Sequence, residues 1–294
     1  MGAETDTGLS GDDLGTTGGA AIRRQVIGGR DVLACQPVEA APADRPPILM
    51  VHGICHGAWC WESTFLPFFA SRGWSGYAVT LRGHHVGATA DDLKGHSIAD
   101  YVEDVKVVGD GLPGRPILIG HSMGGMIVQR YLESHGAAAA VLLASMPPRA
   151  PLRSPALRHH PCLLLQGLVK RSALTLFSTP ERCRALFFSD HTPDEVVDDC
   201  TTRLTDESNR AVLDLLRGKK VRRRTDTPTP MLVVGARNDA LFSAGQAEHT
   251  AAFYGADSMI LADTGHNIMM EPRWREAADH IDAWLRHRLL AEHA

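Results

Sequence analysis

Three residues that lie far apart in the chain, Ser122, Asp239 and His266, have the types that serine-based covalent catalysis requires. A serine hydroxyl is a poor nucleophile near neutral pH and needs a base, most often a histidine, to take its proton. The histidine in turn needs an acid that holds its ring in the correct tautomer. We therefore predict that Ser122 is a nucleophile, that His266 is its base and that Asp239 orients that base.

Ser122 lies at the centre of a Gly-x-Ser-x-Gly motif, residues 120–124. The apolar run 117–119 before it predicts a buried parallel strand, and apolar residues at helical spacing follow from Met126. Only a sharp turn fits between them, and Gly120 and Gly124 allow strand and helix to approach closely. Such a turn forces the serine into a strained conformation, which we expect to be exposed above the edge of the sheet.

The other two residues follow predicted strands in the same way. Asp239 comes just after the strand 231–234, and His266 comes just after the strand 258–261. Because the carboxyl ends of parallel strands meet at one edge of a sheet, both side chains should reach the edge that carries Ser122. Asp263 is the competing acid, but it lies only three residues before His266, which is too close in the chain to orient its ring.

An acyl-transfer site also needs two N–H groups for the oxyanion. We predict that Met123, directly after the nucleophile, provides one of them, and that Ile54, in the loop after the strand 48–51, provides the other. The remaining candidates for substrate binding are Gly53, His52 and His121. Gly53 keeps the loop close to the bound carbonyl, His52 is expected to shape that loop, and His121 should point away from the nucleophile.

Predicted strands and helices alternate along most of the chain. The strands are expected at 22–27, 31–36, 48–51, 77–79, 117–119, 140–144, 231–234 and 258–261, and the helices at 61–71, 97–112, 126–132, 244–254 and 276–290. The first two strands flank Gly28-Gly29, which is a hairpin signal. The alternation predicts an α/β fold with a mostly parallel, doubly wound sheet, formed by residues 21–146 and 226–294.

The pattern changes in the residues 147–225, where prolines cluster and apolar residues recur at helical spacing without a convincing strand. We predict a helical insertion that covers the strand ends as a lid. The basic run 219–224 within it is either an anion-binding patch or a solvated hinge back to the core.

The first 20 residues contain almost no large apolar side chains, so we expect a disordered tail without the features of a signal peptide. The net charge of −4 gives no indication of nucleic-acid binding. No uncharged apolar stretch approaches the roughly 20 residues that a membrane-spanning helix needs, so we expect a cytoplasmic protein. The six cysteines and 15 histidines show no metal-site spacing, which predicts free thiols and no metal.

From about residue 22 to residue 290 the chain resembles the α/β-hydrolase superfamily. The matching pieces are His52-Gly53, the segment 120–125, Asp239 and Gly265-His266. This resemblance implies a lidded α/β-hydrolase fold and a Ser122–His266–Asp239 triad. Thr80 is a departure, because many relatives have an aspartate before the Arg-Gly-His loop, and we expect it to affect loop packing only.

The segment 52–61 resembles the plant methylesterase and hydroxynitrile-lyase branch of that superfamily. In the lyases a lysine follows the catalytic histidine and a threonine follows the first histidine of the oxyanion loop. Here these positions are Asn267 and Gly53, which favours a hydrolase. A cation near the leaving anion is what cyanide release needs, and an arginine of the lid is the alternative source of that charge.

We therefore expect a serine hydrolase that cleaves a carboxylic ester, a thioester or a lactone of a small apolar substrate, without a cofactor. Two alternatives stay open. The triad could serve a lyase or cyclase in a biosynthetic pathway, or the chain could be a small-molecule receptor that retains the fold. The sequence carries no signal for the oligomeric state.

Overall fold

The computed structural model describes residues 13–17, 20–39, 45–89, 91–149, 170–218, 220–224 and 229–290. The described strands form one sheet in the order β1-β2-β3-β5-β4-β6-β7-β8-β9. They are β1 (Asp13–Thr17), β2 (Ala20–Ile27), β3 (Arg30–Cys35), β4 (Ile48–Val51), β5 (Gly76–Val79), β6 (Ile117–His121), β7 (Ala139–Leu143), β8 (Met231–Ala236) and β9 (Asp257–Leu261). In the sheet order, the neighbouring strands β5-β4-β6-β7-β8-β9 are all parallel to one another. This confirms the predicted α/β fold with a mostly parallel sheet.

The amino-terminal side of the sheet is antiparallel. β2 and β3 pair as a hairpin with Ile27 opposite Arg30, and Gly28 and Gly29 have φ angles of 55° and 75°. Positive φ at both central residues is the geometry of a two-residue turn whose twist matches the strands, so the predicted hairpin is confirmed.

The predicted tail of residues 1–20 is wrong for the part of it that the structure describes. Residues 13–17 form β1, which pairs antiparallel with β2, and β2 itself begins at Ala20. An edge strand offers unpaired N–H and C=O groups that a further strand can join whatever its side chains are. A low apolar content therefore does not exclude a strand at this position. The residues 1–12, 18 and 19 lie outside the described part.

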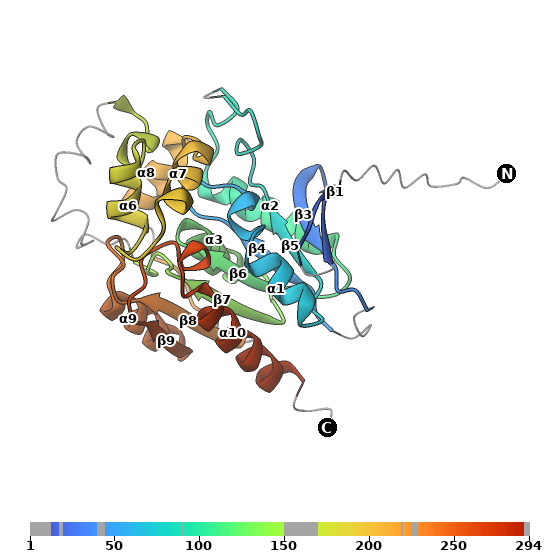
Figure 1. Ribbon diagram of the computed structural model, residues 1–294. Helices are drawn as coiled ribbons and strands as arrows, with labels where there is room; N and C mark the ends of the chain where they lie inside the picture. Colours follow the sequence, from blue (N-terminus) through green and yellow to red (C-terminus); the bar gives the residue numbers. More distant parts are fainter. Residues whose placement is uncertain are drawn as a thin grey trace.

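Helices cover both faces of the sheet (Figure 1). α1 (Phe65–Ser71) and α10 (Trp274–Leu289) pack on one apolar core, and α2 (Ile98–Asp110), α3 (Met123–Tyr131) and α9 (Ala244–Tyr254) pack on the other. Alternate residues of one strand serve the two cores: Ile48 and Met50 face the first, whereas Leu49 and Val51 face the second. The central strands are therefore apolar at successive positions.

Two helix starts differ from prediction. The helix expected from residue 61 is a 3₁₀ turn, η1 (Ala58–Trp61), followed by α1 from Phe65. The backbone is interrupted at Thr64, which has a φ of −132° and whose hydroxyl donates to the Met269 carbonyl at 2.7 Å. The helix expected from Met126 begins three residues earlier, at Met123. The helix expected at 97–112 is α2, which is capped by Ser97, since the Ser97 hydroxyl accepts from the Asp100 N–H.

Between β7 and β8 the described residues 170–218 and 220–224 contain helices and no strand. They include η2 (Leu174–Leu176), α6 (Pro180–Phe187), α7 (Asp194–Arg203) and α8 (Asn209–Arg217). Figure 1 shows α6, α7 and α8 gathered beyond one end of the sheet. These helices have an apolar core of their own, which includes Phe187 and Cys200 and continues onto Cys55 of the sheet domain. We refer to this part as the helical insertion. The apolar groups predicted at 163–165 and 168–169 lie outside the described residues.

Within the described residues, no helix has both the length and the apolar character needed to cross a membrane. The described cysteines, at positions 35, 55, 60, 183 and 200, are all buried and free.

Candidate active site

Ser122 occupies a sharp turn between β6 and α3, with φ 53° and ψ −116°. Backbones are in direct contact around this turn: a Cβ atom at Gly124 would lie 2.2 Å from the Val51 carbonyl oxygen, and one at Gly120 would lie 2.5 Å from the Gly124 carbonyl oxygen. Both positions therefore require glycine. The turn is fixed further by the Ser122 N–H, which donates to the Leu143 carbonyl at 3.0 Å.

The expectation of an exposed serine is wrong, because Ser122 is only 4% exposed. The loop that follows β4 lies directly against it. An added Cβ at Gly53 would be 3.0 Å from the Ser122 Cβ and 2.9 Å from the His121 Nδ1. A serine at the edge of the bare sheet would be open to solvent, so the burial comes from segments that lie beyond that edge.

Asp239 and His266 are brought together from loops that follow β8 and β9. His266 Nδ1 lies 2.8 Å from Asp239 Oδ2, and both side chains are buried. The other carboxylate oxygen of Asp239 accepts from the N–H groups of Leu241 at 2.7 Å and Phe242 at 2.9 Å. These bonds fix the carboxylate in its orientation toward the imidazole.

Asp263, the competing acid, is placed elsewhere. Its side chain is 63% exposed and lies 3.5 Å from an Arg273 guanidinium nitrogen. Asp239 therefore contacts the histidine, whereas Asp263 faces solvent.

The second ring nitrogen of His266 has a different environment. Nε2 is buried and has no hydrogen-bond partner among the described side chains and backbone. The ring lies between two aromatic side chains, with centroid distances of 5.9 Å to Phe187 and 5.6 Å to Phe242. In the neutral imidazole, a proton on Nδ1 facing the carboxylate makes Nε2 the acceptor nitrogen.

The loop after β4 is a tight turn in which the His56 N–H donates to the Gly53 carbonyl at 3.3 Å. Cys55 has a φ of 63°, and its carbonyl accepts from the Thr205 N–H of the helical insertion at 2.9 Å. The N–H groups of Ile54 and Met123 find no acceptor within the described part of the chain. Two donors without acceptors beside a serine are what an oxyanion requires.

His52 is held by the backbone on both sides of its ring. Nδ1 donates to the Gly53 carbonyl at 2.9 Å, and Nε2 accepts from the Leu81 N–H at 3.1 Å. Burial lowers the pKa of this imidazole well below its ordinary value, so the ring is neutral. Both nitrogens are occupied, and the geometry therefore supports a role in shaping the loop over direct substrate contact.

His121 points toward the loop of His266. Its Nε2 donates to the His266 carbonyl at 3.1 Å, and the two rings are 4.8 Å apart. Burial lowers the pKa of His121 as well. The residue next to the serine thus helps to hold the backbone of the histidine.

The sequence analysis missed a link between the two loops, formed by His56 and Asn267. His56 Nδ1 donates to the Ile54 carbonyl at 2.8 Å, and His56 Nε2 accepts from Asn267 Nδ2 at 3.1 Å. Burial lowers the pKa of His56 to about 4, which keeps it neutral. The position of His56 two residues after Ile54, in a loop already assigned to the oxyanion, was the available signal.

Glu271 was also missed. This carboxylate is 1% exposed and accepts from the N–H groups of Gly265 at 2.9 Å and Ser189 at 2.6 Å. It accepts in addition from the hydroxyls of Ser189 and Thr192, at 2.8 Å and 2.9 Å. Glu271 thereby ties the residue before His266 to the helical insertion. Its position directly after the apolar run 268–270 was the signal for a buried acid.

The chain matches the model of a family described as "Alpha/beta hydrolase family" over residues 48–279. Among curated proteins it is 38% identical over 106 residues to a non-heme haloperoxidase of Rhodococcus erythropolis, covering 35% of this chain and 38% of that protein. It is also 38% identical over 88 residues to methyl jasmonate esterase 1 of Vitis vinifera, covering 29% of this chain and 33% of that protein. The alignments thus span between a third and two fifths of these relatives.

Among solved structures, an esterase from Thermogutta terrifontis superposes with a TM-score of 0.66 at 17% identity, covering 95% of this chain and 99% of that one. At so low an identity this similarity concerns the fold alone.

Proposed function

Because the chain belongs to the alpha/beta hydrolase family, we propose that it hydrolyses a carboxylic ester through an acyl-enzyme on Ser122. The observation that carries this proposal is the state of His266, whose Nδ1 is engaged by Asp239 while its buried Nε2 has no partner among the described atoms. Relatives named as esterases support the same reaction class.

In the proposed reaction, Ser122 Oγ attacks the carbonyl carbon of the ester while His266 Nε2 takes the hydroxyl proton of Ser122. Asp239 stabilises the imidazolium that forms, without accepting its proton. The N–H groups of Met123 and Ile54 stabilise the oxyanion of the tetrahedral intermediate. The imidazolium then protonates the leaving alcohol, and water activated by the same histidine releases the acid.

We propose that the substrate is a small molecule with an apolar acyl part, and that the helical insertion acts as a lid. Phe187, the last residue of α6, supports this assignment. Its ring is parallel to the His266 ring within 20°, and its carbonyl accepts from the Asn267 N–H at 2.8 Å. The insertion thus reaches the reacting side chains themselves. No cofactor is part of this scheme, and the free buried thiols are in keeping with the cytoplasmic location that we propose.

The lyase alternative is less well supported. Cyanide release needs a cation close to the leaving anion, and the position after His266 is the neutral Asn267. That amide is completely buried and is directed at His56 and at Cys200 Sγ, 3.8 Å away. It is therefore engaged inside the protein and carries no charge.

The test uses purified protein, a fluorophosphonate probe and p-nitrophenyl esters of graded chain length. We expect the probe to label Ser122, the esters to turn over, and Ser122→Ala to abolish both while the fold is retained. Mandelonitrile and a halide with hydrogen peroxide are assayed in parallel. Cyanide release or halide oxidation without any ester turnover would refute the proposal, as would undiminished turnover by Ser122→Ala.

A further inference from the structure

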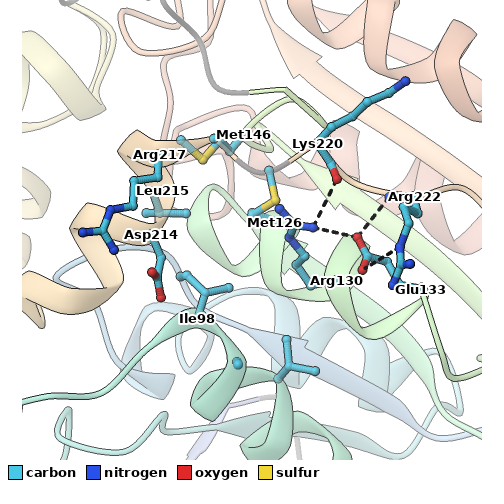
Figure 2. A pocket seen from close by; sticks show the side chains of 13 residues that line it. Ile98, Met126, Arg130, Glu133, Met146, Asp214, Leu215, Arg217, Lys220 and Arg222 are labelled. Atoms are coloured by element: carbon cyan, nitrogen blue, oxygen red, sulfur yellow. Dashed lines mark hydrogen bonds and ion pairs between the residues drawn. The ribbon is translucent and has the colours of Figure 1, made fainter.

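A cavity that is not lined by the proposed catalytic residues lies between α2, α3 and the end of α8. Its volume is about 680 Å³, within the range of about 300 to 1,000 Å³ that is usual for small-molecule sites. Figure 2 shows its lining side chains, which come from α2, from α3 and the turn after it, from Met146, and from the end of α8 with the residues that follow it. Ser122, Asp239, His266 and the oxyanion loop are not among them.

The floor of this cavity is apolar. It is formed by Ile98 and Val102 of α2, Met126 of α3, Leu215 of α8 and Met146, which follows β7. In Figure 2 the two methionines lie in the middle, with Leu215 on one side and Glu133 on the other. Methionine side chains adapt readily to irregular apolar ligands, so such a floor suits a hydrocarbon group of variable shape.

The rim carries more positive than negative charge. Four cationic residues line it, Arg130, Arg217, Lys220 and Arg222, against the two acids Glu133 and Asp214. Glu133 is already engaged, because it accepts from Arg130 Nη1 at 2.7 Å and from the Arg222 N–H at 3.0 Å. The same cluster holds the basic segment against α3, since Arg130 also donates to the Lys220 carbonyl at 3.4 Å.

Two of the cations remain available to a ligand. In the described part of the chain, the exposed side chains of Arg217 and Lys220 have no hydrogen-bond or ion-pair partner. Figure 2 shows these two side chains on opposite sides of the cavity, so a single carboxylate can meet only one of them, and Arg217 is the better placed. Arg217 extends from the end of α8, which places a guanidinium at the mouth of an apolar cavity. A guanidinium in that position matches a carboxylate, to which it can donate two parallel hydrogen bonds.

We propose that this cavity binds an amphipathic carboxylate, a monocarboxylic acid with a medium-length aliphatic or aromatic body, at a site separate from the catalytic one. The hydrocarbon part lies on the apolar floor, and the carboxylate lies at the rim next to Arg217. In the basic run 219–224, Lys220 lies outside this anion site, and Arg222 holds the run against Glu133.

The test is calorimetric titration of the whole protein with three probes of equal chain length: decanoate below its micellar concentration, decanol and decyltrimethylammonium. We expect saturable binding that is tightest for decanoate and weakest for the cation, and that weakens with added salt. Equal binding of all three probes, or no saturable binding of decanoate, would overturn the proposal.

Variants locate the site. Arg217→Glu reverses an exposed charge at the rim and should weaken decanoate binding about five- to tenfold. Val102→Glu places a negative charge on the apolar floor, where it repels the decanoate carboxylate. This variant should weaken decanoate binding to a similar extent. Arg223→Glu is the matched control, because it makes the same charge reversal at an exposed arginine of the neighbouring basic run 219–224, outside the cavity. Weakening by Arg223→Glu equal to that by Arg217→Glu would contradict the proposed site.

A membrane contact is the competing explanation for basic residues beside an apolar surface. Flotation with phosphatidylglycerol vesicles distinguishes it. Co-flotation that is lost in Arg217→Glu, in a protein that does not bind free decanoate, would replace our proposal. Protein that binds decanoate and stays with the unfloated fraction would support it.

Discussion

Among single residues, the acid that orients His266 gives the sharpest test of the proposed mechanism. Asp239→Asn keeps the shape of the side chain but removes the charge that fixes the imidazole tautomer. We expect kcat for a p-nitrophenyl ester to fall on the order of 10⁴-fold, with little change in stability. Steady-state kinetics of the purified variant, with circular dichroism as a check on folding, measures this.

Asp263→Asn is the matched control for that substitution. Asp263 is 63% exposed and faces Arg273, so its loss should change kcat by less than about threefold. A larger loss in Asp263→Asn than in Asp239→Asn would transfer the role of the acid to Asp263.

Glu271 is a residue whose importance lies in the backbone that it holds. Glu271→Ala removes an acceptor of four hydrogen bonds and leaves the N–H groups of Gly265 and Ser189 buried without partners. We expect the free energy of unfolding to fall by about 3 to 5 kcal/mol, because each unsatisfied buried donor costs about 1 to 3 kcal/mol. Urea denaturation measures the loss.

The control is Glu248→Ala, which removes an exposed carboxylate on α9 and should change stability by less than about 0.5 kcal/mol. If Glu271→Ala were no less stable than Glu248→Ala, the buried network around Gly265 would not hold the loop as described.

At the scale of elements, α6 carries Phe187, whose ring faces the His266 ring. Phe187 stacks on Phe177 at 4.2 Å and lies 5.9 Å from the His266 ring. Phe187→Leu removes ring volume beside His266, where the proposed ester would react. We expect the ratio of kcat/KM for the octanoate ester over the acetate ester to rise up to about tenfold. Kinetics with both p-nitrophenyl esters measures the ratio.

Phe253→Leu, the same change on α9, is the control and should leave the ratio unchanged, since Phe253 packs on Tyr254 and not on the site. An unchanged ratio in Phe187→Leu would contradict the view that the insertion sets acyl preference.

The elements show which features a single sequence can predict. Strands such as β4 and β8 and the elbow at Ser122 follow from local signals: apolar runs, and glycines where backbones touch. The interruption at Thr64 depends instead on the Met269 carbonyl, 205 residues away. The buried position of Ser122 likewise depends on a loop from another part of the chain. Contacts of that kind have no local pattern, which is also why His56, Asn267 and Glu271 were missed.

In the whole molecule, a buried polar network joins the helical insertion to the sheet domain. His84 Nε2 lies 3.1 Å from Glu207 Oε2, and the Tyr101 hydroxyl donates to Glu207 Oε1 at 2.6 Å. Burial by itself lowers the pKa of His84, but the charge and hydrogen bond of Glu207 outweigh it, and the pKa is raised above its ordinary value of 6.5. His56 behaves in the opposite way, because burial lowers its pKa to about 4.

These two shifts give stability a maximum near neutral pH. Between about pH 6.5 and 4 the unfolded chain binds a proton that His56 in the folded protein does not, so stability falls as the pH falls through that window. With a shift from 6.5 to about 4, this group alone accounts for about 3 kcal/mol. His52 and His121, whose pKa values burial also lowers, add to the loss on the acid side.

Above pH 6.5 the predicted loss of stability comes from His84. Its raised pKa means that the folded protein holds a proton which the unfolded chain releases above pH 6.5. The stabilisation from the His84–Glu207 pair is therefore complete below pH 6.5 and is lost as the pH rises through the folded-state pKa of His84.

His84→Gln removes the titrating group, so the stability of this variant should be lower than that of the wild type near pH 6 and should approach it at higher pH. Urea denaturation of both proteins from pH 5 to 9 measures the difference, in which groups common to both cancel. If the difference were constant from pH 6 to 9, His84 would not be charged in the folded protein, and the link between insertion and sheet domain would be a neutral hydrogen bond.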